Sequence, residues 1–555
     1  MNFKKYMLSS AAAVIALGMA SCVSDLDVTP IDPNSVMEVD EAALFTKCYA
    51  NMALAGNTGA NGDCDIDGLD GGTTGFVRQL WNANELTTDE AICCWGDDGI
   101  PQFNNNQWDA SHPMLRGFYY RLYVGIDYCN HYLDVCAGAD ETHEAEVRFL
   151  RCLYYYYLLD CWGNVPFAMQ ISAESPHQIK RADLYAWIEA ELLGKEVTIN
   201  AMDDNSVELF SGAGYGVVDK LVAPASRKST DEGYGRADKD AAYMLLARLY
   251  LNAEVYTGTA HWADAQTYAE LVVNGPHKLN TTSSNGFSAY QMLFMGDNGE
   301  TAASSEAVLA LLQDGVTTTS WGTALFLMAS TWKSDMDENS NYGTTEFWAG
   351  NRARRALLDK FFPTSDAPQV TISGMVAAAN DERALFHGKD RSLTCETWNE
   401  FTSGYSCGKF RNTYTTGAAG HNSQFVDMDF FLMRSAEAYL ISAEADARLN
   451  GGTTSSTGAS RINSLRARAN CASRASSYSL DDILDERARE LYYEGFRRTD
   501  LIRFGYYGGA NSAKYVWEYK GGVYAGSALA STRNLFALPD EDMNANPNLK
   551  QNEGY

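Results

Sequence analysis

Carboxylates are the most abundant groups in this 555-residue chain that could do chemistry, because it has 71 aspartates and glutamates against 43 lysines and arginines. A glycosidase needs only two carboxyl groups placed across the scissile bond. With so many available, any single pair is weak evidence for catalysis. The sequence has no nucleophile elbow, zinc motif or phosphate-binding loop, and Gly233-Tyr234-Gly235 is too short to count as one. A glycosidase is therefore the less favoured interpretation.

Oxygen-rich loops suggest a second kind of chemistry, the binding of a calcium ion. The run Asp63-x-Asp65-x-Asp67-Gly68 matches the start of an EF-hand loop, but its twelfth position is Thr74 where the motif needs glutamate. This run is more typical of a solvated turn. We expect that no cofactor is required and that a structural Ca²⁺ has only weak candidate ligands, namely Asp297, Asp427 and Asp429.

Cys22 is the cysteine whose position indicates a modification. It follows two lysines, an apolar stretch from Met7 to Met19, and Ala20-Ser21. A basic start, a short apolar core and small residues before the cut are typical of a secretory signal, and a cysteine directly after it makes the signal that of a lipoprotein. The sequence predicts a signal peptide over residues 1–21, an acylated Cys22, and a flexible acidic tether over residues 22–40.

Charge and composition limit the possible partners. The formal net charge of −28 disfavours nucleic acids and anionic lipid faces, which would be repelled. No second apolar run is long enough to span a bilayer. Aromatic residues make up 12% of the chain, and flat rings suit the faces of sugars, although the core must account for most of them. The eleven cysteines after Cys22 lack paired spacing, so we expect mostly free thiols, with Cys93-Cys94 as a vicinal pair.

Helical periodicity predicts the elements that must position such residues. Apolar side chains recur at helical spacing over residues 144–161, and residues 236–274 are typical of two helices joined by a short turn. Residues 431–450 have the same small-residue pattern, and a further helix follows Ser479, where Asp482 completes a capping box. The sequence predicts a mainly α fold, with helix pairs that look like tetratricopeptide units.

Two long stretches lack this periodicity. Residues 56–108 and 285–350 interleave Gly, Asn, Asp, Thr and Trp, which predicts irregular loops. Ordered loops on a rigid scaffold are where binding residues usually lie. We therefore expect one domain over residues 41–555, in which these loops form the ligand-binding lobe.

The C-terminal third resembles a known family. Its sequence is similar to the signature of the SusD/RagB family of outer-membrane nutrient-binding lipoproteins in the segments 432–440, 443–445, 466–470, 486–491, 494–505, 538–539 and 546–555. Together with Cys22, residues 84–90 and residues 235–239, the resemblance covers essentially the whole mature chain. It implies a scaffold of tetratricopeptide-like helix pairs, a lipid-anchored position on the cell surface at the outer membrane, and a SusC-type TonB-dependent transporter as partner.

The same resemblance implies a ligand and its contacts. Family members bind glycans, or peptides in the RagB branch, and do no chemistry. Alignment with the starch-binding member places five residues on its ligand-contacting positions: Arg78, Trp95, Asp98, Trp321 and Trp348. Asp98 replaces an asparagine and Cys93 replaces a tryptophan, which leaves the glycan's identity open. We expect capture of starch-like α-glucan for the transporter, with another glycan such as a fructan or xylan, or a peptide, as the alternatives.

Overall fold

The computed structural model describes residues 39–62, 64–336 and 342–555. The chain divides into residues 1–41 and a compact unit formed by residues 42–555. Cys22, the predicted signal peptide and most of the predicted tether lie outside the described residues, so these remain predictions. Among the helices that are described, none combines the length and apolar character needed to cross a membrane.

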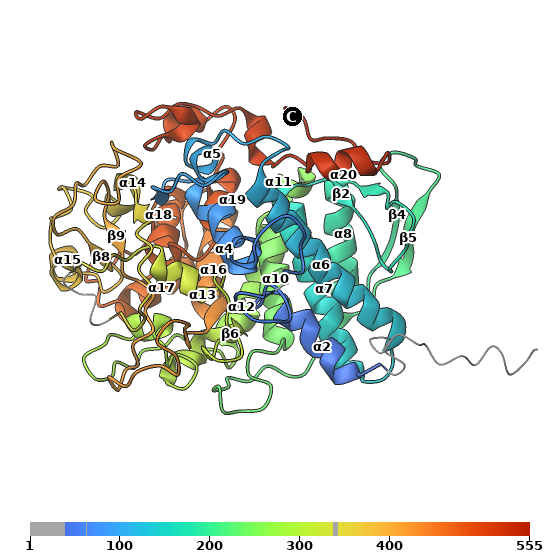
Figure 1. Cartoon of the computed structure of the whole chain (residues 1–555), viewed down its shortest axis with the longest axis horizontal. Coiled ribbons are helices and arrows are strands. Elements are labelled where there is room, and N and C mark those ends of the chain that lie inside the picture. Colours follow the sequence, from blue (N-terminus) through green and yellow to red (C-terminus); the bar gives the residue numbers. More distant parts are fainter. Residues whose placement is uncertain (1–38, 63, 337–341) are drawn as a thin grey trace, which may run out of the picture. The chain divides into compact units, whose positions relative to one another are not determined.

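Long helices form the scaffold of the large unit, which confirms the mainly α prediction (Figure 1). In one group α6 packs against α7 and α7 against α8; in another α10 packs against α12, α12 against α16, and α16 against α17 and α18. Their bounds are α6 Pro113–Val135, α7 Glu141–Cys161, α8 Arg181–Leu193, α10 Lys239–Leu251, α12 Trp262–Asn274, α16 Ser435–Leu449, α17 Ser456–Arg468 and α18 Leu480–Leu491. The tetratricopeptide likeness of these pairs stays a prediction.

Local signals in the sequence set the ends of these helices. The Asp140 side chain accepts hydrogen bonds from the first amides of α7, and Ser479 and Asp482 form the predicted capping box of α18. One expectation was wrong: residues 430–434 form the strand β10, and the helix predicted from residue 431 begins only at Ser435. This run is buried at every position, and a short apolar run has the same pattern in a buried strand as in a helix.

Strands are short and occur as antiparallel pairs. Within the described residues there are five two-stranded sheets. They are β1 (Ala91–Cys93) with β7 (Asn351–Ala353), β2 (Val165–Pro166) with β3 (Gln178–Ile179), β4 (Glu196–Asn200) with β5 (Glu208–Ala213), β6 (Ala307–Leu311) with β10 (Phe430–Arg434), and β8 (Phe386–His387) with β9 (Ser406–Cys407).

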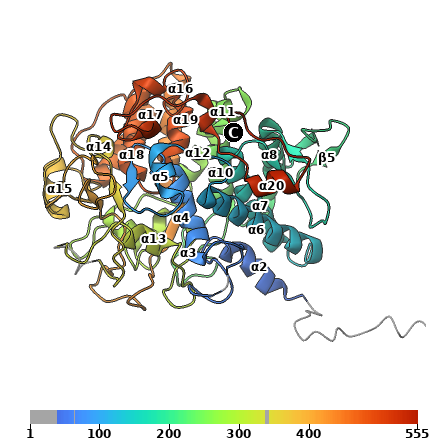
Figure 2. The same cartoon turned by 45° about the horizontal axis from the view of Figure 1, so that its top comes forward.

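The stretches predicted to be irregular contain several short helices. Residues 56–108 include α3, α4, a π-helical turn and α5, and residues 285–350 include α13. Figure 2 shows α3 and α4 beside the long helix α6, and α13 packs against α4. The short helices are α2 (Glu41–Ala50), α3 (Gly71–Thr74), α4 (Phe76–Trp81), α5 (Ile100–Asn105), α9 (Val217–Lys220), α11 (Ala253–Thr257), α13 (Ala324–Ala329), α14 (Arg355–Leu358), α15 (Ile372–Ala379), α19 (Arg497–Arg503) and α20 (Asp540–Ala545).

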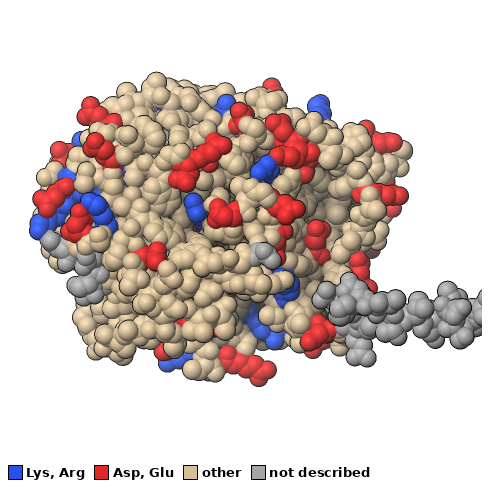
Figure 3. All heavy atoms as spheres, viewed as in Figure 1, with Lys and Arg blue, Asp and Glu red and all other residues tan. Residues whose placement is uncertain are grey.

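Ion pairs are buried inside the scaffold. Arg434 contacts both Glu490 and Glu494 at 2.7 Å, Arg497 contacts Asp89 at 2.7 Å, and Arg248 contacts Glu437 at 2.7 Å. None of these side chains is more than 5% exposed. The acidic excess lies on the surface instead, where Figure 3 shows aspartate and glutamate scattered over the visible face.

Candidate functional site

The pairing of β1 with β7 brings two of the predicted tryptophans together. The amide of Cys94 extends the ladder by donating to the carbonyl of Gly350 at 3.1 Å. Trp95 follows β1 and Trp348 precedes β7, so their side chains lie at the same end of the pair. Their ring centroids are 6.4 Å apart with planes at 53°, and Trp95 Nε1 donates to the carbonyl of Trp348 at 3.2 Å.

Helix α13 brings in the third tryptophan. Trp321 lies just before this helix, and the amide of Trp348 donates to the carbonyl of Ala329, its last residue, at 2.8 Å. The rings of Trp321 and Trp348 are 6.1 Å apart with planes at 51°. Trp95, Trp348 and Trp321 therefore form a continuous series, in which each ring is tilted against the next. We call these three residues the tryptophan cradle.

The exposure of the cradle separates it from ordinary core packing. All three rings are half-buried, whereas Trp81, Trp162 and Trp187 are among the fully buried side chains. The two outer rings of the cradle each rest on a core aromatic: Trp321 packs on Phe425 at 4.8 Å and Trp95 packs on Phe326 at 6.3 Å. Tryptophans that pack on the core and are still partly open to solvent can contact a ligand.

Polar side chains hold two of the rings in place. Trp348 Nε1 donates to Glu346 Oε2 at 2.8 Å, and Gln424 Nε2 donates to the other oxygen of Glu346 at 2.7 Å. Trp321 Nε1 donates to Asn61 Oδ1 at 2.9 Å. Glu346, Gln424 and Asn61 were not predicted from the sequence. Gln424 lies 78 residues from its partner Glu346, and Asn61 lies 260 residues from its partner Trp321. No local signal in the sequence therefore links them to the cradle.

Arg78, the arginine predicted to contact ligand, lies beside the cradle. It projects from α4 with its guanidinium 5.8 Å from the ring centre of Trp95 and 5.3 Å from that of Phe326. Its Nε is buried and has no hydrogen-bond partner within the described chain. Burial lowers the pKa of Arg78, and the charges of Asp70 and Asp97 oppose that shift. The side chain as a whole is half-buried, and a planar cation with several N–H donors suits vicinal hydroxyl groups.

Asp98 is placed differently from the other predicted residues. It is exposed, and its Oδ1 accepts a 3.3 Å hydrogen bond from Gln102 in α5. Its neighbour Asp97 is the one whose charge acts on Arg78. The structure therefore brings Arg78 and the three tryptophans together and leaves Asp98 at the margin.

The vicinal cysteines have different environments. Cys93 is fully buried, its amide and carbonyl are both hydrogen-bonded to the Asn104 side chain, and burial raises the pKa of its thiol to about 12. Cys93 is thus a core thiol beneath the loop. Cys94 is half-buried and its thiol donates to the carbonyl of Ala349 at 3.2 Å. All eleven cysteines described are free thiols.

The weak calcium candidates are mostly engaged by protein donors. The carboxylate of Asp427 accepts from both the amide and the ring of His421, and that of Asp429 accepts from the Gln313 amide and the Tyr234 hydroxyl. Asp297 Oδ1 is buried without a partner in the described chain. In that part of the chain, no three His, Cys, Asp or Glu side chains are grouped to hold a metal ion. Calcium binding stays a prediction.

The EF-hand-like run does not form a calcium loop between two helices. Asp63 lies outside the described residues. Asp65 pairs with Arg121 at 3.4 Å, and α3 begins at Gly71, inside the span that the loop would need. The Asp70 side chain caps that helix by accepting from the amide of Thr73.

Solved structures share this fold. The fold matches that of a SusD superfamily protein from Parabacteroides distasonis, with a TM-score of 0.63 and 19% identity over 93% of this chain and 98% of that one. It also matches surface glycan-binding protein A from Bacteroides thetaiotaomicron in complex with laminarihexaose, with a TM-score of 0.61 and 18% identity over 92% and 98% of the two chains. At this identity, the likeness shows the fold.

The chain belongs to the SusD family. The family's sequence model matches residues 259–555. The starch-binding protein SusD of Bacteroides thetaiotaomicron is 35% identical to this chain, in an alignment that covers 100% of this chain and 99% of the relative.

Proposed function

We propose that the protein captures starch-like α-glucan at the cell surface and acts by binding alone. The observation that carries this proposal is the tryptophan cradle, in which successive rings are tilted by 53° and 51°. The C–H face of a glucose ring packs on an aromatic plane. Rings that face different directions suit a chain that curves, because a straight chain would contact fewer of them at once.

Arg78 supplies the polar part of this proposed site. Its guanidinium lies beside the ring of Trp95, and the side chain is only half-buried. A sugar stacked on Trp95 would place hydroxyl groups within reach of this planar donor. Stacking and hydrogen bonding would then act on the same sugar unit, which favours a carbohydrate over an apolar ligand.

The cellular setting is part of the proposal. The starch-binding relative supports an α-glucan as ligand. We propose that acylated Cys22 anchors the protein in the outer membrane, and that it passes the glycan to a SusC-type transporter. Catalysis has no role in this scheme, so maltoheptaose incubated with the protein should be recovered intact by chromatography.

Calorimetric titration of the full-length protein in detergent tests the ligand class. The titrants are maltoheptaose, laminarihexaose, xylohexaose, a fructan oligosaccharide and a hexapeptide. We expect maltoheptaose to bind most tightly and its binding to collapse in Trp95→Ala. The matched control is Trp262→Ala, a half-buried tryptophan on α12. Preference for another titrant would overturn the α-glucan proposal, and binding that survives Trp95→Ala would overturn the proposed site.

A further inference from the structure

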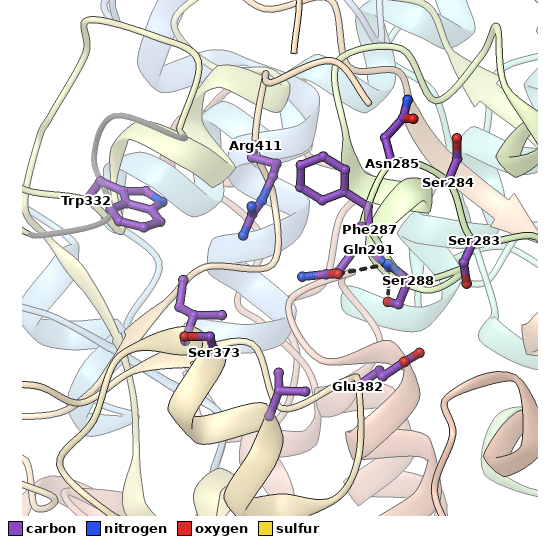
Figure 4. Close-up of a pocket in the computed structure, with 13 residues that line it drawn as sticks. Ser283, Ser284, Asn285, Phe287, Ser288, Gln291, Trp332, Ser373, Glu382 and Arg411 are labelled. Atoms are coloured by element: carbon purple, nitrogen blue, oxygen red, sulfur yellow. Dashed lines mark hydrogen bonds between the residues drawn. The ribbon is translucent and has the colours of Figure 1, made fainter. Parts of the chain in front are cut away.

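A cavity of about 680 Å³ lies between the turn formed by residues 283–288 and the start of α15 (Figure 4). It shares no lining residue with the tryptophan cradle. Sites for small molecules usually have volumes of about 300–1,000 Å³. The cavity is therefore large enough for a ligand of two or three sugar units.

Two residues that line the cavity each carry a buried polar atom that has no partner within the described chain. Trp332 Nε1 and Glu382 Oε2 are both buried and make no hydrogen bond within the described chain. Native proteins leave few buried polar groups unsatisfied, so each one needs an explanation. One of these atoms is a donor and the other an acceptor, and a hydroxyl group can satisfy either.

The remaining lining mixes apolar and neutral polar groups. Phe287, Ile372 and Val376 provide apolar surface, and serines contribute several hydroxyl groups. Gln291 extends into the cavity opposite Arg411 (Figure 4). Its Oε1 accepts a hydrogen bond from the backbone amide of Ser288 at 3.0 Å, which fixes the orientation of the Gln291 side-chain amide. Such a lining suits a molecule with both C–H faces and hydroxyl edges.

Two backbone hydrogen bonds close the turn beside the cavity. Asn285 and Gly286 have φ values of 51° and 86°, and Ser284 and Phe287 exchange two backbone hydrogen bonds of 3.1 and 2.9 Å. Positive φ at both central residues is typical of a type I′ turn, which Asn-Gly favours. The backbone at Phe287 is thus held in place before a ligand arrives, which reduces the entropy lost on binding.

We infer that this cavity is a second binding site, separate from the cradle, for a short neutral saccharide. Arg411 and Glu382 balance each other in charge, which disfavours a purely anionic or cationic ligand. A zwitterion such as a dipeptide is less suited, because the Asn470 side chain already occupies the other oxygen of Glu382. The inference goes beyond the proposed function and stands if the cradle binds something else.

Saturation-transfer NMR of the full-length protein tests the second site in a Trp348→Ala background, where the cradle is weakened. The probes are maltotriose, xylotriose and dialanine. We expect a saccharide signal that persists in this background and falls about fivefold or more when Trp332→Phe or Glu382→Ala is added, because each removes one hydrogen bond. The matched control is Glu396→Ala, an exposed carboxylate that does not line the cavity.

Three outcomes would overturn the inference: no signal from either saccharide, a signal that neither substitution reduces, or a signal from dialanine alone. Thermal unfolding shows whether each variant is folded. Crystals of the unsubstituted protein soaked in maltotriose and in xylotriose provide a second test. We expect saccharide density in the cavity, and an empty cavity in both soaks would contradict the inference. If maltoheptaose does not bind the cradle, the expected NMR and crystallographic results for the cavity stay the same. The two proposals can therefore be refuted independently.

Discussion

Replacing Trp348 with alanine is the sharpest test of the cradle, because this ring is its centre. The substitution removes the contacts with Trp95 at 6.4 Å and with Trp321 at 6.1 Å. Aromatic pairs of this kind contribute about 0.5–1.5 kcal/mol each, so the free energy of unfolding should fall by about 1–3 kcal/mol. The hydrogen bond from Trp95 Nε1 goes to the main-chain carbonyl of Trp348, which alanine retains.

The same substitution should also weaken ligand binding. Truncating a central aromatic contact typically costs about 2 kcal/mol or more. Since about 1.4 kcal/mol corresponds to a tenfold change in affinity, maltoheptaose should bind Trp348→Ala roughly 30-fold more weakly. Trp95 and Trp321 remain to hold the ligand in part, so binding should be weakened and still measurable at high protein concentration.

The assay is calorimetric titration with maltoheptaose, with thermal unfolding of the same samples. Trp262→Ala is the matched control, because Trp262 is also half-buried and lies 5.7 Å from a cation, Arg448, outside the cradle. It should lose stability and keep its affinity within about twofold of the unsubstituted protein. A Trp348→Ala variant that binds as tightly as the unsubstituted protein, or a Trp262→Ala variant that loses as much affinity, would refute the cradle as the ligand site.

Three further predictions concern a glycine beside the cradle, a buried histidine and the calcium candidate. A Cβ at Gly350 would collide with the Trp95 ring, whereas one at Gly96 meets open space, so Gly350→Ala should weaken maltoheptaose binding about tenfold or more and Gly96→Ala should not; equal calorimetric affinities would contradict this. Burial lowers the pKa of His112 from 6.5 to about 4. Its neutral form therefore stabilises the fold above pH 6.5, and about 3 kcal/mol is lost as the pH falls to 4. Urea unfolding at pH 7.5 and 4.5 should show a smaller pH effect in His112→Asn, and an unchanged one would refute the assignment. If a structural calcium exists, excess Ca²⁺ after EDTA treatment should raise the unfolding temperature, and Asp297→Asn should abolish the rise; no rise in the unsubstituted protein would remove the calcium prediction.

The helices were predictable because their signals are local. The apolar stripe of α7 and the capping box of α18 lie within single stretches of sequence, and the structure confirms both. The strand β10 was missed because its pairing with β6 joins segments more than 100 residues apart, and nothing local distinguishes a buried strand of five residues from a helix.

The candidate site was only partly predictable for the same reason. The family resemblance placed the three tryptophans in different loops, but what brings Trp95 to Trp348 is the register of two three-residue strands that are 260 positions apart. Asp98 was predicted to lie in the site, but the charge that acts on Arg78 is that of its neighbour Asp97. Which of two adjacent side chains faces the site depends on the direction of one turn, and residue spacing does not determine that direction. Asn61 was missed because its partner, Trp321, lies in another loop.

The charged residues of the family signature stabilise the scaffold, whereas the residues of the ligand site determine what is bound. Burial alone would raise the pKa of Glu490, but Arg468 and Arg434 outweigh it and lower the pKa to about 2. Removing one partner of a buried ion pair costs about 3–5 kcal/mol, so such residues constrain each other within the scaffold. The charged signature residues therefore identify the fold. The three tryptophans of the cradle are not among these charged signature residues, so membership of the family leaves its ligand to be measured.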